Sequence, residues 1–421
     1  MPNPLPVIVA DFKQAKAGIV AVVALIALAV GLGVGVSAQE RAFREGSTRA
    51  ADPFDLLIGA RGSETQLVLS SIYLQTSPLD LIAGDVLQDL IEDRRVRFAS
   101  PIGFGDNYRG YPVVGVTPAF VTENTGKVVE GAVFRAINQV VVGFDVRLEI
   151  GETFTPTHGR ITQVGNETGH GHLAYQVVGR LSRLGNPWDR AILAPIEAVW
   201  WVHGLPAGHP EYAAIFDLGA DHADATVNLE ALPLGPPFDR AHLPGVPAIV
   251  VEPTTFAAAY QLRQQYRSDA RTMALFPAEV LLQIYSMVGD VRDLLAVISV
   301  ITQVLVVGAI LLAVLAALAL RRKTIAVLRA MGASQGYIFL TVWLNVTLMI
   351  AVGAVLGLFV GWGTAEVLSA VFAGRTGLLL PVSLSFQEYA LVATIVAIGV
   401  VLAAIPSLLT YRQSVSAALR Q

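Results

Sequence analysis

The sequence predicts an α+β membrane protein: four transmembrane helices in a one-plus-three arrangement, extended stalk helices, and a large two-lobed outer domain. First, the 421 residues are 54% hydrophobic and only 15% charged, with a mean hydropathy of +0.58. That composition is too apolar for a soluble protein of this length. Second, four segments supply the roughly 20 apolar residues that cross a bilayer. Third, a long stretch of ordinary globular sequence separates the first segment from the other three.

The four predicted transmembrane segments are 17–37, 293–320, 337–365 and 389–411. None of them has an ionisable residue in its middle. Ion pumps and proton-coupled carriers usually place such residues on the transport path. The sequence therefore argues against a pore or carrier whose path runs through these four helices.

Basic residues at the ends of the segments predict their orientation. Lys13 and Lys16 precede the first segment, and the loop after the second and the tail after the fourth are also basic. The positive-inside rule then predicts cytoplasmic 1–16, 321–336 and 412–421, and outer 38–292 and 366–388. Arg41 and Arg44 fall on the outer side, in a long segment that is translocated largely regardless of its charge.

The first segment has an alternative interpretation as a cleaved signal peptide. The residues "VSA" at 36–38 resemble a cleavage site. However, the apolar run over 17–37 is longer than the roughly 7–15 residues of a signal-peptide core. A transmembrane helix is therefore the favoured interpretation.

The outer segment 38–292 has mixed strand and helix patterns. A capping box of Ser77 and Asp80, with Pro78 at the first helical position, predicts a helix over 77–93. Farther along, the pattern predicts a strand at 246–253, a helix at 254–266 and a strand at 272–276. The section between, about 118–180, is rich in valine, glycine and threonine and predicts strands. We therefore expect an α/β lobe with a β-rich insert.

Two helices are candidates for stalks between the membrane and the outer domain. From Pro277 to Leu320 only Gly289 and Gly308 interrupt the helical pattern, and the first segment continues in the same way through 39–50. Pro277 suits the first helical position. The alternative is a break near Gly289.

Small residues predict close helix packing in the membrane. Gly353, Gly357 and Gly361 are spaced by four, and small-xxx-small spacing lets helix backbones approach each other. The alternative is that glycine is simply common in membrane helices. Gly31, Gly33 and Gly35 are spaced by two and are not expected to form one face.

Several stretches resemble one family of membrane proteins. The loop "RRKTIAVLRAMGASQGYIF" at 321–339 and the final "IPSLLTYRQSVSAALR" at 405–420 are similar to the corresponding parts of FtsX/MacB-type (type VII) ABC transporter permeases. In the outer segment, "VVGVTPAF" at 113–120, "VVVGFDVRLEIGETF" at 140–154 and "YQVVGRL" at 175–181 are similar to the periplasmic region of MacB-like permeases. The one-plus-three layout also resembles this family.

The resemblance implies a homodimeric permease in the bacterial inner membrane, with both termini cytoplasmic and 38–292 in the periplasm. It implies that two copies of a separate ATPase bind ATP and Mg²⁺, and this chain has no G-x-x-x-x-G-K-[ST] of its own. It also implies that loop 321–336 is a coupling helix for that ATPase. In the family, the stalks relay ATPase motion to the periplasmic domain by mechanotransmission. A periplasmic adaptor, a lipoprotein or a metal-binding protein is a further partner to expect.

The coupling-loop residues form a pattern that suits docking in a groove. Ile325, Leu328 and Met331 recur at spacings of three on one helical face. Basic residues flank this stripe, and a glycine suited to a C-cap follows it: Arg322, Lys323, Arg329 and Gly332. The alternative is a helix lying flat on lipid. Thr324 departs from the family, whose members often have a glutamate there, so a carboxylate contact to the ATPase is absent or replaced at this position.

All seven histidines lie in the outer segment, between His158 and His242. His170 and His172 form H-x-H, and on a strand two such residues share a face. With His158 nearby, they are candidate zinc ligands. The alternative is that they are ordinary surface histidines, because no cysteine or glutamate completes an evident motif.

Two functions remain open. The first is the permease subunit of an ATP-driven transporter for a periplasmic or outer-leaflet substrate: a lipoprotein, a peptide, a small amphiphile or a metal-linked cargo. The second is an FtsX-like signalling subunit that activates a periplasmic partner without transport. An enzyme is disfavoured, because the chain contains no H-E-x-x-H and no G-x-S-x-G. No basic patch suggests nucleic acid.

Overall fold

The computed structural model describes residues 4–14, 16–75, 77–158, 173–212, 229–284 and 332–404, with single positions at 297, 301, 304 and 308. Contacts divide the chain into two compact units. Unit 1 comprises 1–44, 288–371 and 380–421, and unit 2 comprises 45–287 and 372–379. The described part of unit 1 is helical, whereas unit 2 is built on a β-sheet.

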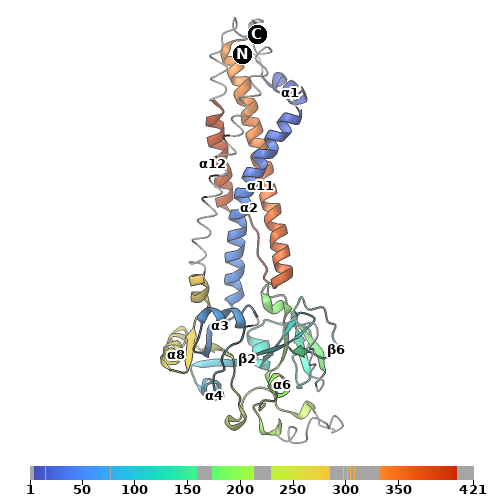
Figure 1. Ribbon diagram of the computed structural model, residues 1–421, viewed down its shortest axis with the longest axis vertical. Coiled ribbons are helices and arrows are strands. Elements are labelled where there is room, and N and C mark those ends of the chain that lie inside the picture. Colours follow the sequence, from blue (N-terminus) through green and yellow to red (C-terminus); the bar gives the residue numbers. More distant parts are fainter. Residues whose placement is uncertain are drawn as a thin grey trace. The chain divides into compact units, whose positions relative to one another are not determined.

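Unit 1 contains α1 (Leu5–Gln14) and α12 (Phe386–Leu402), together with most of α2 (Lys16–Ala51) and of α11 (Gln335–Thr376). Figure 1 shows α2, α11 and α12 running alongside one another. Among the described residues, α2 and α11 are long and apolar enough to cross a membrane, and α12 is a shorter apolar helix. They correspond to the first, third and fourth predicted segments. The second segment lies outside the described residues except for four single positions, so the count of four stays a prediction.

The helices extend beyond the predicted segments. Helix α2 runs without a break to Ala51, and α11 runs to Thr376. The charged residue Glu366 ends the apolar run in the sequence, but the helix continues beyond it. Helix α11 ends where Gly377 takes a φ of +74° and donates its N–H to Ala373 O at 2.8 Å. This left-handed conformation is typical of a helix C-terminus. The predicted loop 366–388 is therefore helical at both ends.

The described strands of unit 2 form one hydrogen-bonded sheet, in the order β11-β1-β10-β2-β3-β9-β5-β8-β4. Strand β6 pairs with β8, and β7 pairs with β2. The strands are β1 (Leu56–Ala60), β2 (Val96–Tyr108), β3 (Tyr111–Val116), β4 (Val128–Gly131), β5 (Gln139–Val142), β6 (Thr153–Phe154), β7 (Thr157–His158), β8 (Tyr175–Leu181), β9 (Ile192–Pro195), β10 (Ala248–Pro253) and β11 (Thr272–Leu275). Most pairs are antiparallel, but β3 with β9 and β5 with β8 are parallel.

Mixed α/β architecture is thus confirmed, whereas a division into two lobes is not. The expected insert, 118–180, contributes β4 to β8, but it begins with a helix, α5 (Pro118–Glu123). Its strand β5 pairs with β9, which in turn pairs with β3. Both β3 and β9 lie outside the insert in sequence. The insert therefore continues the same sheet.

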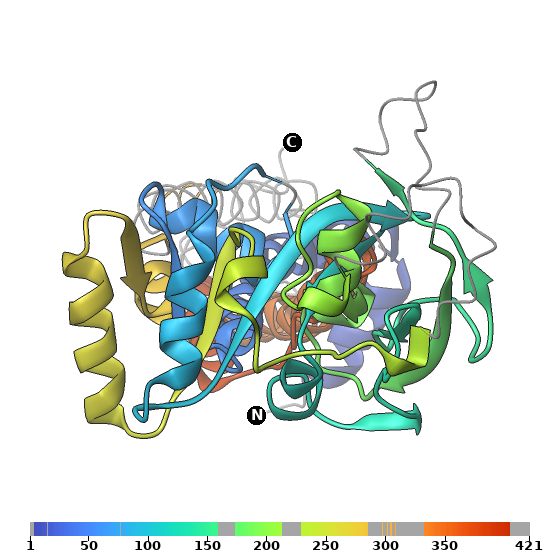
Figure 2. The ribbon, with the colours of Figure 1, turned by 90° about the horizontal axis from the view of Figure 1, so that it is seen from below.

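Other described helices of unit 2 are α3 (Glu64–Ser71), α4 (Gly84–Glu92), α6 (Ile196–Val202) and α8 (Phe256–Ser268), with 3-10 turns η1 (Pro187–Arg190), η2 (Leu229–Ala231) and η3 (Arg240–His242). Residues 277–284 are helical as well, at the start of the stalk predicted from Pro277, and most of that predicted stalk lies outside the described residues. Figure 2 shows α8 and α4 side by side along the sheet. The predicted strand–helix–strand at 246–276 corresponds to β10, α8 and β11. Thr255 caps α8 by accepting a hydrogen bond from Ala258 N at 3.1 Å.

The helix predicted over 77–93 is wrong at its start. Helix α4 begins at Gly84, after Ala83, with no side-chain cap. The Ser77 hydroxyl instead accepts a hydrogen bond from Gln66 Nε2 at 2.8 Å, and Gln66 Nε2 also donates to Pro78 O at 2.6 Å. Ser77, which the sequence pattern predicts as the helix cap, therefore makes a tertiary contact with Gln66 of α3 instead.

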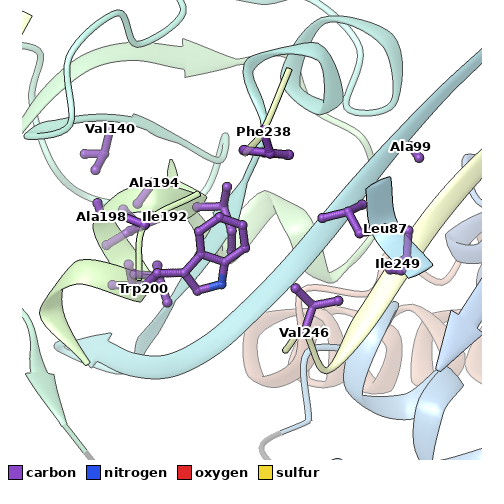
Figure 3. Packing of buried hydrophobic residues seen from close by; sticks show 14 of the residues in the cluster. Leu87, Ala99, Val140, Ile192, Ala194, Ala198, Trp200, Phe238, Val246 and Ile249 are labelled. Carbon is purple, nitrogen blue, oxygen red and sulfur yellow. The ribbon is translucent and has the colours of Figure 1, made fainter. Parts of the chain in front are cut away.

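The core of unit 2 lies where helices cover the sheet. Figure 3 shows part of it, with Trp200 from α6, Ile192 from β9 and Ile249 from β10. Trp200 is 3% exposed, and its ring meets that of Phe238 edge to face at 5.7 Å. Strands β1 and β10 are buried along almost their whole length, as "LLIGA" and "AIVVEP" suit.

Candidate helix-packing and coupling residues

The three predicted packing glycines of α11 lie against α2. A Cβ built on Gly353 would be 2.7 Å from Ile26 Cβ, and one on Gly357 would be 2.6 Å from Val30 Cβ. At Gly361 the nearest atom would be the Gly31 backbone oxygen, at 2.6 Å. Side chains larger than hydrogen do not fit at such distances. The two backbones therefore approach as closely as small-xxx-small packing allows.

Helix α2 contributes glycines to the same contact. A Cβ on Gly31 would be 3.2 Å from Gly357 O, and one on Gly35 would be 3.4 Å from Gly361 O. The expectation that no face forms from the α2 glycines is therefore wrong for Gly31 and Gly35. They are spaced by four, and the intervening Gly33 conceals that spacing in the sequence. We call these five glycines, Gly31, Gly35, Gly353, Gly357 and Gly361, the glycine seam.

A buried ion pair ties the start of α12 to α2. Arg41 Nη1 lies 2.6 Å from Glu388 Oε1, and the two side chains are 9% and 0% exposed. Ser37 Oγ donates to the same carboxylate oxygen at 2.7 Å. Arg41 also donates from Nη1 to Ser385 Oγ at 2.7 Å and from Nη2 to Ser383 O. The guanidinium is thus shared between a carboxylate and two other acceptors, so its charge is compensated.

The Glu388 carboxylate also caps its own helix. Its Oε2 accepts hydrogen bonds from Ser385 N and Ser385 Oγ, both at 2.7 Å. With Ser385 accepting from the backbone, this forms a capping box at the first turn of α12. The S-x-x-E spacing is visible in the sequence, and could have predicted this helix start. Arg41 as its partner could not be found that way, because 347 residues separate the two.

Helices α11 and α12 contact each other directly as well. Trp343 Nε1 donates to Val400 O at 3.1 Å. A Cβ on Gly399 would lie 3.1 Å from Ile350 Cδ1. Helix α11 is therefore packed against α2 through the glycine seam and against α12 through larger side chains.

Most of the predicted coupling residues lie outside the described residues. They are Arg322, Lys323, Ile325, Leu328, Arg329 and Met331. Gly332 is described and has a φ of +92°, in the left-handed region. Two residues later, Ser334 O and Ser334 Oγ accept from Tyr337 N at 3.1 and 3.3 Å, at the beginning of α11. Helix α11 thus begins three residues after Gly332.

Two of the three predicted zinc ligands, His170 and His172, also lie outside the described residues. His158 is in β7, opposite Asp106 of β2. Within the described ranges, no group of three metal-binding side chains is found. The zinc site stays a prediction, which a zinc titration of the full chain tests. We expect His170→Ala/His172→Ala to abolish binding; a wild type that binds no zinc would end the idea.

Three described histidines each lie near a carboxylate. Nε2 of His203 is 3.9 Å from Asp106 Oδ1, and Nε2 of His209 is 3.8 Å from Glu197 Oε1. His242 Nδ1 is 2.5 Å from Asp239 Oδ2, and that hydrogen bond lowers the pKa of Asp239. These contacts belong to the fold of unit 2.

The geometry defines a class of protein: a membrane protein whose apolar helices pack through a glycine seam, with a large mixed α/β unit in the same chain. Residues 296–418 match the family model of the FtsX-like permease C-terminal domain. The C-terminal segment is therefore similar to the C-terminal domain of FtsX-like permeases, and the resemblance predicted from 321–339 and 405–420 is confirmed. In this class of permease a separate ATPase hydrolyses ATP. No curated protein sequence matches the chain.

The solved structures that resemble the chain include the following two. The periplasmic region of MacB from Actinobacillus actinomycetemcomitans matches with a TM-score of 0.33 and 10% identity, over 56% of this chain and 95% of that one. The extracellular domain of the noncanonic ABC-type transporter YknZ from Gram-positive bacteria matches with a TM-score of 0.29 and 9% identity, over 52% of this chain and 98% of that one. TM-scores of this size do not establish a shared fold.

Proposed function

We propose that this chain is the permease subunit of an ATP-driven ABC transporter and that it relays the motion of a separate ATPase to its periplasmic domain. Its substrate is a periplasmic or outer-leaflet lipoprotein, peptide, small amphiphile or metal-linked cargo. Two copies of the chain pair with each other and with two ATPase subunits. The inner membrane holds the protein, with both termini in the cytoplasm.

The match of residues 296–418 to the FtsX-like permease domain is the main support for this proposal. That segment includes loop 321–336, whose apolar stripe and basic flanks suit docking into a groove on another protein. The continuity of α2 and α11 provides the second support. Each helix begins in unit 1 and ends in unit 2, so each connects the two units through unbroken hydrogen-bonded backbone.

The coupling loop gives a direct test. Leu328→Asp or Met331→Asp places a charge in the apolar stripe, and burying an unpaired carboxylate in a protein groove costs several kcal/mol. We expect each variant to lose substrate-stimulated ATP hydrolysis at least tenfold in the complex with its ABC ATPase. Unchanged stimulation in both variants would contradict the proposed docking.

Ala330→Asp is the matched control for these substitutions. On a helix of 3.6 residues per turn, residue 330 lies roughly opposite the face shared by 325, 328 and 331. The same charge added there should leave ATP hydrolysis near the wild-type rate. Should Ala330→Asp abolish stimulation as well, the loop lies flat on lipid or is simply intolerant of acidic residues.

A further inference from the structure

Two helices enter unit 2 from unit 1, and the chain segments at their ends contact the same short turn. After α2 ends at Ala51, the chain reaches Phe54. The end of α11 and the residues after it, 372–379, also belong to unit 2. Both segments contact η1 and the residues immediately before it, 185–190. This turn leads directly into β9, in the middle of the sheet.

Phe54 joins the end of α2 to the turn through aromatic packing. The Trp188 ring is 5.9 Å from the ring of Phe54 and 4.9 Å from that of Phe120, centroid to centroid. Trp188 is 1% exposed and Phe54 is 4% exposed. The Phe54 N–H donates to Ala51 O at 2.9 Å, so this ring is fixed to the last turn of α2. Any displacement of that turn would therefore also displace the Trp188 ring.

The segment after α11 holds the other side of the turn by polar contacts. Arg190 Nη1 donates to Gly374 O at 2.5 Å, and Leu379 N donates to Gly185 O at 3.1 Å. Between them, Gly377 packs so tightly that a Cβ would lie 3.2 Å from Pro187 Cα and from Arg190 Cγ and Cδ. Its φ of +74° disfavours other residues independently. The contact is thus specific in both shape and hydrogen bonding.

The turn itself is stiff. Asn186 Oδ1 accepts from Trp188 N at 3.0 Å. The two carboxylate oxygens of Asp189 accept from Leu184 N at 2.8 Å and Gly185 N at 2.7 Å. A Cβ on Gly143 would lie only 2.3 Å from Trp188 O, so the strand β5 region is packed directly on the turn. Internal hydrogen bonds and close packing thus hold the turn in one conformation.

Strand β9 connects this turn to the rest of the sheet. It begins at Ile192, two residues after η1, and its four residues are fully buried. It pairs in parallel with β3 and antiparallel with β5. A displacement of the turn therefore reaches two neighbouring strands through backbone hydrogen bonds.

We propose that η1 is the joint at which unit 2 receives motion from both α2 and α11, with Trp188 as the contact to α2 and Arg190 as the positioning residue for 372–379. This proposal rests on the proposed function, because it names the place where the relayed motion enters the periplasmic domain. The joint passes that motion to β9, and from there to β3 and β5.

Hydrogen exchange of the full chain in nanodiscs with its ATPase tests the joint. Arg190→Ala removes the hydrogen bond to Gly374, and Gly377→Val disrupts the same contact from its other side. In the wild type, ATP should change amide exchange at β9 and β3. In both variants that ATP-induced change should fall at least twofold, while ATPase binding and basal hydrolysis stay at wild-type levels. Trp188 is left intact because its removal would damage the core.

Arg183→Ala is the matched control. Arg183 lies close to the turn in sequence, but its side chain donates to Asp145 Oδ1 at 3.0 Å and lies over the Phe144 ring, so it does not contact 372–379 in these interactions. It should respond to ATP like the wild type. An undiminished ATP response at β9 and β3 in both Arg190→Ala and Gly377→Val would overturn the joint but leave the proposed function standing. A wild type in which ATP changes exchange nowhere would overturn the proposed function, and the joint with it.

Discussion

Replacing Gly361 by leucine should strongly destabilise the folded protein in the membrane. The first added carbon would lie 2.6 Å from the Gly31 carbonyl oxygen and 2.7 Å from Val34 Cβ. One neighbour is backbone, so no rotamer change can relieve the clash. Overpacking costs typically about 1–3 kcal/mol, and more where backbones must separate. We expect about 3 kcal/mol or more at this site, a large fraction of the about 5–15 kcal/mol by which native proteins are stable.

The measurement is the yield of monodisperse full-length protein after detergent extraction, together with its Tm. Gly363→Leu is the matched control on the same helix, because a Cβ there meets nothing within 4 Å. It should extract and melt like the wild type. Equal yields and Tm values for Gly361→Leu and Gly363→Leu would show that α2 and α11 do not pack through the glycine seam.

The second large effect is expected at the Arg41–Glu388 pair. Arg41→Ala leaves a fully buried carboxylate without its cation, and Glu388→Ala leaves the guanidinium without its anion. Removing one partner of a buried pair typically costs about 3–5 kcal/mol, because the other charge stays buried and uncompensated. Glu388→Ala should cost more, since it also removes the capping box of α12. Both variants should show a large loss of Tm in detergent.

A double variant measures the interaction between the two side chains separately from the contribution of each one. Arg41→Leu/Glu388→Leu removes both charges and leaves apolar groups, a change that is often close to neutral for buried pairs. Its loss of stability should therefore be clearly smaller than the sum of the losses for Arg41→Leu and Glu388→Leu. Strict additivity would mean that the two side chains do not interact in the folded protein.

Local patterns in the sequence predicted the parts of this protein that depend on local rules. The apolar segments indicate α2, α11 and α12. The strand, helix and strand patterns within 246–276 indicate β10, α8 and β11, with small errors at the ends. The four-residue spacing of Gly353, Gly357 and Gly361 identified the face of α11 that meets α2. Each of these signals arises within a few turns of one element.

Features that depend on distant partners could not be predicted this way. Ser77 and Asp80 satisfy the rule for a helix start, but a contact from Gln66 uses Ser77 elsewhere. The sequence alone indicates Arg41 only as a tolerated charge outside the membrane, because its partner lies 347 residues away. The contact of 372–379 with η1 is equally long-range. Only the three-dimensional arrangement brings these residues together.

The central claim is that ATP binding by a separate subunit moves the periplasmic domain of this chain. The chain has no cysteine, so one engineered at Thr122, an exposed residue of α5, can be spin-labelled without background. In a homodimer in nanodiscs, with the ABC ATPase bound, the two labels define one distance that electron paramagnetic resonance measures. We predict that ATP shifts this distance distribution and that Leu328→Asp abolishes the shift. An identical distribution with and without ATP in the wild type would contradict the account.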